Sequence, residues 1–261
     1  TRHLHPFASR TDPVRDRASN RASLYYYVWG GFIVRILDLL FPKRCVGCGR
    51  IGKYFCVTCA AGMRPVAVNE CICPMCGRGA IDGITHPRCR TRYGLDGLSS
   101  VFHYQGVVRR AVTTMKYRLV TDIAREFVDV VPDVWIDAIR RRIGNDNVLM
   151  PIPLHPSRLR ERGFNQADIL GKFLCVRIGI APVSAVIERK RKTVAQVAMT
   201  NRSERIANLA GAFGMRRGSF RSPASVVLFD DVFTTGATMR EAANVLKRNG
   251  AKFVWAVTMA R

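Results

Sequence analysis

Two adjacent carboxylates followed by a hydroxyl-rich loop form the segment of this chain best suited to chemistry. Asp230 and Asp231 follow the apolar run 225–229, and residues 234–238 have the sequence TTGAT. Carboxylates accept hydrogen bonds from a ribose diol and help to hold Mg²⁺, while hydroxyls and amides at a helix N-terminus bind phosphate. An acidic helix cap is the simpler alternative, but two acids before TTGxT would be an unusual cap. The segment therefore predicts a pocket for a phosphorylated ribose.

The elements around this loop would hold it at the edge of a sheet. Ser225–Phe229 is a short β-branched run typical of a strand buried on both faces, and Arg240–Asn249 carries apolar residues at helical spacing before Gly250. Phe253–Met259 predicts the next strand. In such a unit the ligand binds beyond the carboxyl end of the first strand, where both aspartates lie. We therefore expect an α/β fold.

The whole segment resembles a known ligand-binding motif. Residues 226–238, VVLFDDVFTTGAT, fill every position of hhhhDDhhTTGxT, the motif of the type I phosphoribosyltransferases. The resemblance implies a twisted parallel sheet with flanking helices, and phosphoribose diphosphate bound with magnesium. It also implies that Asp230 and Asp231 contact the ribose hydroxyls and are the catalytic pair. The residues that it places around the 5-phosphate are Thr234, Thr235, Gly236, Ala237 and Thr238.

A second polar segment follows another predicted strand. Val148–Ile152 is a short apolar run that leads into the basic segment Pro156–Phe164. We interpret this segment as a pyrophosphate loop, because guanidinium groups bind phosphate oxygens in pairs; an exposed basic loop beside no ligand is the alternative. The residues that would grip the pyrophosphate are Arg158, Arg160, Arg162 and Gly163. Asn165 is expected to cap the next helix.

The rest of the main domain alternates predicted strands and helices. We expect a strand at Leu98–Tyr104, a helix at Val107–Tyr117 and a second helical stretch at Thr121–Arg142 that Pro132 interrupts. Glu188–Asn208 carries six basic residues and little apolar content, which predicts a mobile loop or arm. Such an arm could close over a phosphorylated substrate or lie along a nucleic-acid backbone.

Eight of the nine cysteines fall between residues 45 and 89, at spacings typical of metal sites. The predicted zinc ligands are Cys45, Cys48, Cys56, Cys59, Cys73, Cys76, His86 and Cys89. Two residues between paired ligands let both sulfurs reach one ion, and Gly49 and Gly77 let the backbone turn after each pair. The spacing leaves open whether each set closes its own site or the pairs cross, and Cys71 is a spare thiol. Closed four-ligand sites hold structural zinc.

The composition describes a globular, strongly basic protein. The 261 residues are 48% hydrophobic, and 42 basic against 19 acidic residues give a formal net charge of +23 at pH 7. This hydrophobic content excludes a wholly disordered chain. The charge favours nucleic acid or phosphorylated small molecules, with an Arg-rich solvated surface as the alternative. The metal-type cysteine spacing favours a reducing cytoplasm over secretion.

The N-terminal part differs from the rest. Residues 1–30 begin with a polar, Arg-rich stretch without periodicity, and we expect a disordered basic tail. Leu24–Phe41 is apolar, but Arg35 and Asp38 interrupt it; this favours a helix packed on the cysteine module and leaves membrane association open. We therefore divide the chain into the tail, a helix with the zinc-finger module at 31–92, and the phosphoribosyltransferase-like domain at 93–261.

Several motifs recur together in one protein family. They are LLFPKRCVGC, CPMCG, MKYR, PIPLHPSRLRERGFNQADIL and VVLFDDVFTTGAT, with Gln196, Arg202 and Arg205. In this combination the chain resembles the ComF family of bacterial competence and DNA-uptake proteins, from Phe32 to the C-terminus. RGFNQ at residues 162–166 is the most specific motif. His86 replaces a usual cysteine, and the N-terminal tail is long.

The ComF resemblance implies a zinc finger joined to a type I phosphoribosyltransferase-like domain that handles single-stranded DNA during natural transformation. The implied partners are phosphoribose diphosphate or a nucleotide, single-stranded DNA and other DNA-uptake proteins, with Gln196, Arg202 and Arg205 in the flexible loop. It implies no acceptor, so an active phosphoribosyltransferase of nucleotide metabolism is the alternative. A nucleotide-responsive transcription regulator is a weaker alternative, because no helix-turn-helix is evident.

Overall fold

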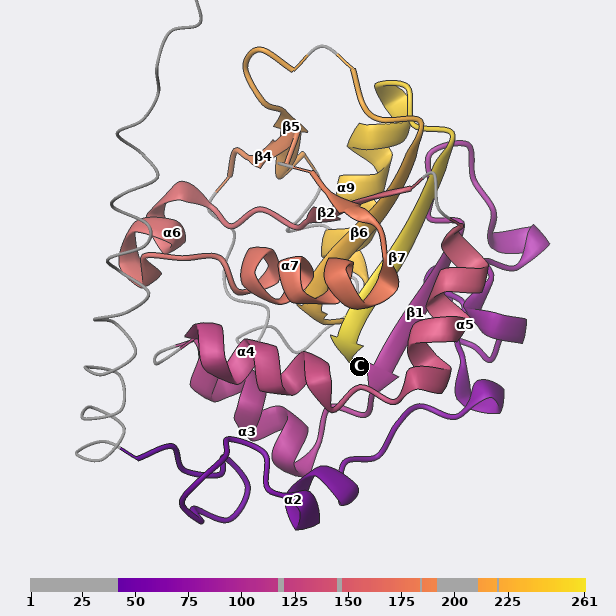
Figure 1. Ribbon diagram of the computed structural model, residues 1–261. Helices are drawn as coiled ribbons and strands as arrows, with labels where there is room; N and C mark the ends of the chain where they lie inside the picture. The colour runs from indigo at the N-terminus through magenta and orange to yellow at the C-terminus, as the bar shows by residue number, and fades with distance from the viewer. Residues whose placement is uncertain (1–41, 117–119, 145–146, 184, 192–210, 220) are drawn as a thin grey trace, which may run out of the picture. The chain divides into compact units, whose positions relative to one another are not determined.

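Five parallel strands form the main sheet of the computed structural model (Figure 1). In sheet order they are β1 (Gly97–Phe102), β7 (Phe253–Ala260), β6 (Ser225–Val232), β2 (Val148–Pro151) and β3 (Ala181–Pro182). Each neighbouring pair is parallel. The structure describes residues 42–261 apart from 117–119, 145–146, 184, 192–210 and 220. The parallel sheet predicted from the sequence is confirmed.

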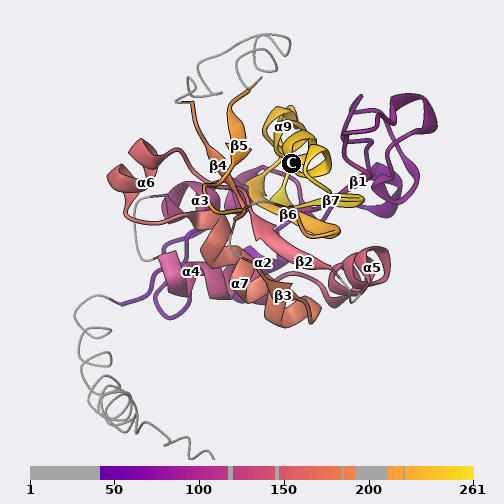
Figure 2. The ribbon, with the colours of Figure 1, turned by 90° about the horizontal axis from the view of Figure 1, so that it is seen from above.

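Helices cover both faces of this sheet, as the view in Figure 2 shows for α7 and α9. Side chains alternate along β6: Val227 and Phe229 join one hydrophobic cluster, and Val226 and Leu228 join the other. The first cluster is covered by α3 (Gly106–Met115), α4 (Val120–Asp129), α5 (Asp133–Ile143) and α7 (Gln166–Ile178). The second is covered by α9 (Ala237–Arg248) and by the antiparallel pair β4 (Ile187–Arg189) and β5 (Phe213–Met215). The architecture is consistent with the phosphoribosyltransferase-like fold.

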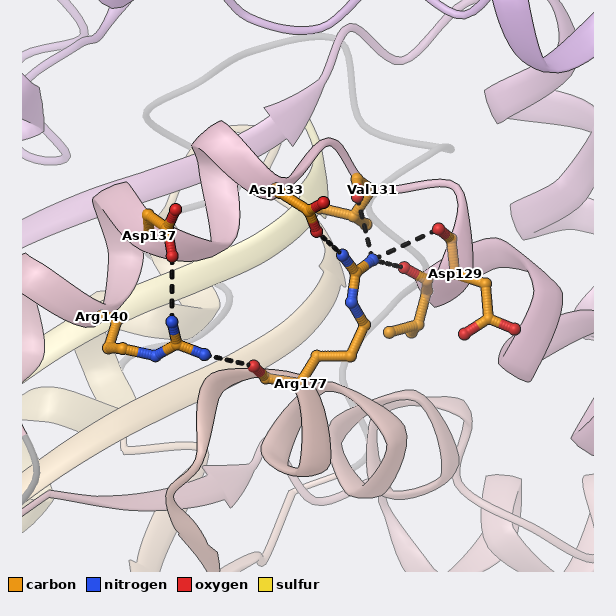
Figure 3. A network of polar contacts seen from close by, with 7 residues as sticks. Asp129, Val131, Asp133, Asp137, Arg140 and Arg177 are labelled. Atoms are coloured by element: carbon orange, nitrogen blue, oxygen red, sulfur yellow. Dashed lines mark hydrogen bonds and ion pairs between the residues drawn. The ribbon is translucent and has the colours of Figure 1, made fainter.

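Helix α7 packs against the sheet at close range and is tied to its neighbours at its end. A Cβ atom at Gly171 would lie 2.9 Å from Leu149 Cδ2, so a larger residue there would have to displace the buried Leu149 side chain. At the carboxyl end of α7, the Arg177 guanidinium donates to the carbonyl oxygens of Val128 at 2.6 Å and Val131 at 2.9 Å and pairs with Asp133 (Figure 3). This network joins α7 to the turn between α4 and α5.

The cysteine module comprises α2 (Val57–Ala61) and three 3₁₀ turns, Val68–Glu70, Ile81–Gly83 and Pro87–Cys89. It packs on the sheet domain, since the Tyr54 amide donates to Glu126 Oε2 of α4 at 2.7 Å. Residues Arg44–Arg261 form one compact unit that contains the module together with the sheet. The proposed domain boundaries at residues 30 and 92 stay predictions.

Three local predictions differ from the structure. Pro156–Phe164 was expected to be a loop, but Pro156–Arg162 forms the helix α6, because His155 caps its start, proline occupies its first turn and Gly163 ends it in the left-handed conformation. Strand β6 continues past Phe229 to Val232, because its register pairs Asp230 with Thr258 of β7. Helix α9 begins at Ala237 and not at Arg240, with Gly236 as its N-cap.

Other predicted features agree with the structure, and some lie outside the described residues. Pro132 separates α4 from α5 as expected, and Asn165 caps α7 by accepting from the Ala167 amide at 3.2 Å. The predicted tail 1–30 and the predicted helix 24–41 lie outside the described residues. Within the described part of the chain, no helix has the length and apolar character that crossing a membrane requires.

Candidate functional site

At the neighbouring strands β2 and β6, the connections that leave the two strands run toward opposite edges of the sheet. From β6 the chain passes through α9 to β7, and from β2 it passes through α6 and α7 to β3 on the opposite side. In parallel α/β sheets, ligands bind at the carboxyl ends of strands that part in this way. A cavity of about 590 Å³ opens there, lined by the last residues of β6, by Ile152 and Leu154 just after β2, by α6 and by β4.

The two aspartates lie at this cavity, in the last residues of β6. Asp230 Oδ1 accepts a hydrogen bond from the Asp231 amide at 2.9 Å. Burial raises the pKa of Asp230 well above its usual value, and the neighbouring Asp231 carboxylate adds to the effect. A cation or the hydroxyl donors of a ligand would relieve this repulsion, so the pair is suited to either.

The loop after β6 brings donors to the same cavity. Thr234, Gly236, Ala237 and Thr238 line it, whereas Thr235 does not; its hydroxyl accepts from the Ala237 amide at 3.4 Å. Gly236 has a φ of 73°, in the left-handed region that favours glycine. No acidic residue lies in the first turn of α9. The positive end of this helix therefore faces the cavity without an acidic neighbour in that turn.

Helix α6 brings some of the residues predicted to bind pyrophosphate to the cavity. Arg158 and Arg162 line the cavity together with Glu161, while Arg160 is exposed and Gly163 ends the helix, and neither of these two is in the lining. The helix explains the difference, because residues two apart on a helix point in different directions. Two of the three predicted arginines are thus brought to the aspartates.

The RGFNQ segment anchors the start of α7 at the cavity. Arg162 Nη1 donates to Gln166 Oε1 at 3.2 Å, and Asn165 Nδ2 donates to the carbonyl of Ile152, just after β2, at 2.9 Å. Gln166 is 3% exposed and lines the cavity, and its Nε2 atom has no hydrogen-bond partner among the described residues. A buried amide donor at a cavity wall is a suitable contact for a ligand oxygen.

The first four predicted zinc ligands form one cluster. The sulfurs of Cys45, Cys48, Cys56 and Cys59 all lie within 4.8 Å of one another, and Cys48 and Cys56 Sγ are 3.7 Å apart. A tetrahedral zinc site with bonds of about 2.3 Å places its sulfurs about 3.8 Å apart. Burial opposes ionisation of Cys45, but amide hydrogen bonds, first that from Cys56, lower the pKa of its thiol to about 6. The cluster fits structural zinc.

The second four form a separate cluster. The donor atoms of Cys73, Cys76, His86 and Cys89 also lie within 4.8 Å of one another, with His86 Nδ1 3.4 Å from Cys76 Sγ. The other ring nitrogen of His86, Nε2, lies 2.9 Å from the Gly79 carbonyl, the type of contact that orients a metal-binding histidine. Each set therefore closes its own site, which decides the pairing that spacing left open. Cys71 is buried beside the second cluster and outside it.

The two cysteine clusters are structural repeats. The Cys45 amide donates to the Arg50 carbonyl at 2.8 Å, and the Cys73 amide donates to the Arg78 carbonyl at 2.9 Å. Gly49 and Gly77 turn the chain with φ values of 77° and 78°. A family model described as a double zinc ribbon domain matches residues 36–90. We call residues 44–59 the first ribbon and residues 71–89 the second ribbon.

Comparison with known proteins extends beyond the ribbons. The chain is 27% identical over 210 residues to the competence protein ComFC of Bacillus subtilis, covering 75% of this chain and 78% of that protein. It is 31% identical over 204 residues to the DNA utilization protein YhgH of Salmonella typhimurium, covering 75% of this chain and 86% of that protein. The chain belongs to the ComF family. Competence protein F of Haemophilus influenzae matches over a shorter stretch, 32% identical over 114 residues, 43% of this chain and 49% of that protein.

The cavity of this ComF-family chain also contains basic residues that sequence reasoning missed. Arg189 and Lys116 line it. Arg189 belongs to β4, is 9% exposed and lies over the Phe213 ring at 5.6 Å. Burial lowers its pKa, as does Arg158, and Asp230 opposes the change. Glu188–Asn208 was interpreted as a mobile arm, but its first residues form β4, because they pair with β5.

Three predicted residues of the flexible loop, Gln196, Arg202 and Arg205, lie outside the described residues. The structure does place the ends of that segment. Residues 187–189 and 213–215 pair as antiparallel strands, so the segment between them begins and ends next to the cavity wall that Arg189 forms. A role for these three residues in ligand binding stays a prediction.

Proposed function

We propose that this ComF-family protein binds phosphoribose diphosphate or a related nucleotide at the carboxyl ends of β2 and β6. The observation that carries the proposal is the shared cavity, where Asp230 and Asp231 lie beside the Thr234–Thr238 loop and opposite Arg158 and Arg162. The aspartates would accept hydrogen bonds from the ribose hydroxyls, and the loop and the N-terminus of α9 would bind the 5-phosphate. The arginines would bind the diphosphate through paired hydrogen bonds.

Magnesium would enter the site with this ligand. Mg²⁺ prefers oxygen ligands and is usually held by one or two carboxylates together with substrate phosphates. Asp230 and Asp231 offer such oxygens, and the raised pKa of Asp230 reflects a site where a neighbouring cation would be favourable. When bound, the ion would neutralise part of the diphosphate charge.

We further propose that the protein acts on single-stranded DNA during DNA uptake. Its relatives are named competence proteins and DNA utilization proteins, and its formal net charge is +23. A polyanion is a natural partner for such a surface, because binding releases counterions. In this role the cavity would bind its ligand as a regulator of DNA handling.

An active phosphoribosyltransferase is the second candidate function, and the adjacent carboxylates in a partly buried cavity favour it. The bond from ribose C1 to pyrophosphate would break, its electron pair leaving with the pyrophosphate, while a lone pair of the acceptor forms the new bond to C1 and the acceptor loses a proton. The aspartates would hold the ribose, and Arg158 and Arg162 would stabilise the departing pyrophosphate. Pyrophosphate release in an acceptor screen separates this function from ligand binding alone.

Calorimetric titration of phosphoribose diphosphate with Mg²⁺ into zinc-loaded protein tests the cavity. We expect binding by the wild type and no change for Asp137→Asn. For Asp230→Asn with Asp231→Asn we expect a loss of at least about tenfold in affinity, because the charged acceptors for the ribose hydroxyls and the magnesium ion are lost. Asp137 is an exposed aspartate of α5 outside the cavity lining, so it controls for the loss of charge. The absence of wild-type binding, or equal binding by the double variant, would exclude the proposed site.

A further inference from the structure

One arginine joins the second ribbon to the loop that lines the cavity. The guanidinium of Arg240, in the first turn of α9, donates to the carbonyl of Thr235 at 2.7 Å and to that of Gly236 at 3.3 Å. The same group donates to the carbonyl of Met75 at 3.1 Å, between the ligands Cys73 and Cys76. These contacts connect positions that are 165 residues apart in the chain.

The cavity loop and the second ribbon are also in close contact at a point that does not involve Arg240. A Cβ atom at Gly236 would lie 2.4 Å from Phe233 Cζ and 3.2 Å from the carbonyl oxygen of Pro74. Pro74 is buried and directly precedes Met75. A shift of the second ribbon would therefore move the wall against which Gly236 is seated, and Gly236 lines the cavity.

The peptide that Arg240 contacts belongs to the metal site. Its carbonyl is that of Met75 and its N–H is that of Cys76, which hydrogen-bonds to the Cys73 thiol. Arg240 thus holds one side of a peptide whose other side holds a zinc ligand. Metal binding, which fixes Cys73 and Cys76, fixes this peptide and with it the partner of Arg240.

The first ribbon contains an equivalent contact that leads elsewhere. Arg110 of α3 donates to the carbonyl of Gly47 at 2.8 Å, and Gly47 precedes Cys48 as Met75 precedes Cys76. Neither Arg110 nor Gly47 lines the cavity. The two arginines therefore make the same contact with a zinc ribbon, but only Arg240 also holds the cavity loop.

We propose that Arg240 is a positioning residue through which zinc at the second ribbon stabilises the ligand-binding form of the Thr234–Thr238 loop. This inference rests on the proposed function, because its ligand is phosphoribose diphosphate. Coupling between two binding sites is reciprocal. Zinc at the second ribbon therefore strengthens ligand binding, and the bound ligand retains that zinc ion. The first ribbon is outside this coupling.

The wild type tests the reciprocal effect without a substitution. Zinc release to an excess of chelator is followed with a metal-sensitive dye, with and without phosphoribose diphosphate and Mg²⁺. We expect two zinc ions per chain, of which the ligand slows the release of one by about fivefold or more. Cys89→Ser, which removes a ligand of the second ribbon, is expected to keep one ion whose release the ligand does not change. Equal release of both ions with and without ligand would overturn the proposal.

Calorimetry of the arginine variants tests the path. We expect Arg240→Ala to weaken phosphoribose diphosphate binding by about fivefold or more and to abolish ligand protection of zinc. Arg240→Lys keeps the charge but cannot span three carbonyls, so a smaller loss in the same direction is expected. Arg110→Ala is the matched control and should bind the ligand as the wild type does. Thermal unfolding establishes that each variant is folded.

The outcomes separate this inference from the proposed function. If the wild type does not bind phosphoribose diphosphate, the proposed function fails. If the wild type and both Arg240 variants bind equally well, the cavity stands and the coupling is overturned. An equal loss in Arg110→Ala and Arg240→Ala would also overturn it, because the effect would then come from either ribbon and not from the Arg240 contact.

Discussion

At the scale of single residues, the cavity combines opposite charges. Asp230 and Asp231 provide acceptors, and Arg158, Arg162 and Arg189 provide positive charge. A ligand that carries hydroxyls or a metal ion at one end and phosphates at the other suits this combination. The pair of aspartates makes the folded protein less stable, because a partly buried carboxylate beside another is harder to ionise than the same group in the unfolded chain.

Replacing one of these aspartates should therefore stabilise the fold. In magnesium-free buffer at pH 7 we expect Asp230→Asn to raise the free energy of unfolding by about 1 kcal/mol. The pKa of Asp230 is raised in the folded state, so this group favours folding most below its unfolded pKa of about 4, and that contribution declines as the pH rises. Asparagine does not titrate, so the difference in the free energy of unfolding between Asp230→Asn and the wild type should shrink toward pH 4.

Urea unfolding at pH 7 and at about pH 4 measures this difference. Asp137→Asn is the control, since Asp137 forms an exposed pair with Arg140 that should contribute little. A variant that is less stable than the wild type at pH 7 would contradict the expected cost of ionising Asp230, which burial and the Asp231 carboxylate both raise.

At the scale of elements, α7 depends on its carboxyl end as much as on its apolar face. Arg177 donates to the carbonyls of Val128, Asp129 and Val131, and Arg140 Nη2 donates to the Arg177 carbonyl at 2.7 Å (Figure 3). The start of the same helix contacts the cavity through Gln166. The network therefore holds the far end of a helix whose near end forms part of the site.

Arg177→Ala is expected to lower the free energy of unfolding by about 1–3 kcal/mol, because backbone carbonyls lose a charged donor. Chemical denaturation provides the measurement. Lys172→Ala is the matched control on the same helix. Lys172 forms an ion pair with Asp168, both side chains are well exposed, and a change within about 0.5 kcal/mol is expected. Equal effects of the two substitutions would mean that the network adds no stability.

At the scale of the whole molecule, the excess positive charge is the dominant property. The zinc ribbons contribute to it, since Arg78, Arg88 and Arg90 of the second ribbon and its border are exposed, as are Arg50 and Lys53 of the first. Proteins bind single-stranded nucleic acid chiefly through contacts between basic side chains and the phosphate backbone, together with base stacking. The proposed DNA function thus requires no further pocket.

Binding to single-stranded DNA is expected to weaken steeply with salt. For about six phosphate contacts, affinity should fall by on the order of a hundredfold between 50 and 200 mM salt. Fluorescence anisotropy with a labelled oligonucleotide across this range measures the slope. Binding that is absent at low salt, or that salt does not affect, would exclude an electrostatic DNA contact.

Local sequence features predicted the parts of the fold and of the site that depend on neighbouring residues. The strand, loop and helix around Asp230 were identified because their periodicity and their TTGAT turn lie within about 25 residues of chain. The helix α6 was missed, because a short run of arginines between His155 and Gly163 has no apolar face to indicate it. Arg189 was missed for a related reason. It lies in β4, which pairs with a strand that begins more than twenty residues later in the chain, at Phe213.

The sequence by itself determined that this chain has two pairs of zinc knuckles and a strand that leads into two aspartates, and it predicted a phosphate-binding loop after them. These features are local, because a knuckle or a turn needs only a few adjacent residues with the right backbone freedom. Only the tertiary structure decided that each ribbon closes its own metal site, that Arg158, Arg162 and Arg189 meet Asp230 at one cavity, and that Arg240 reaches Met75. Those contacts join residues far apart in the chain, and they exist only where the packing of the sheet, helices and ribbons brings them within reach.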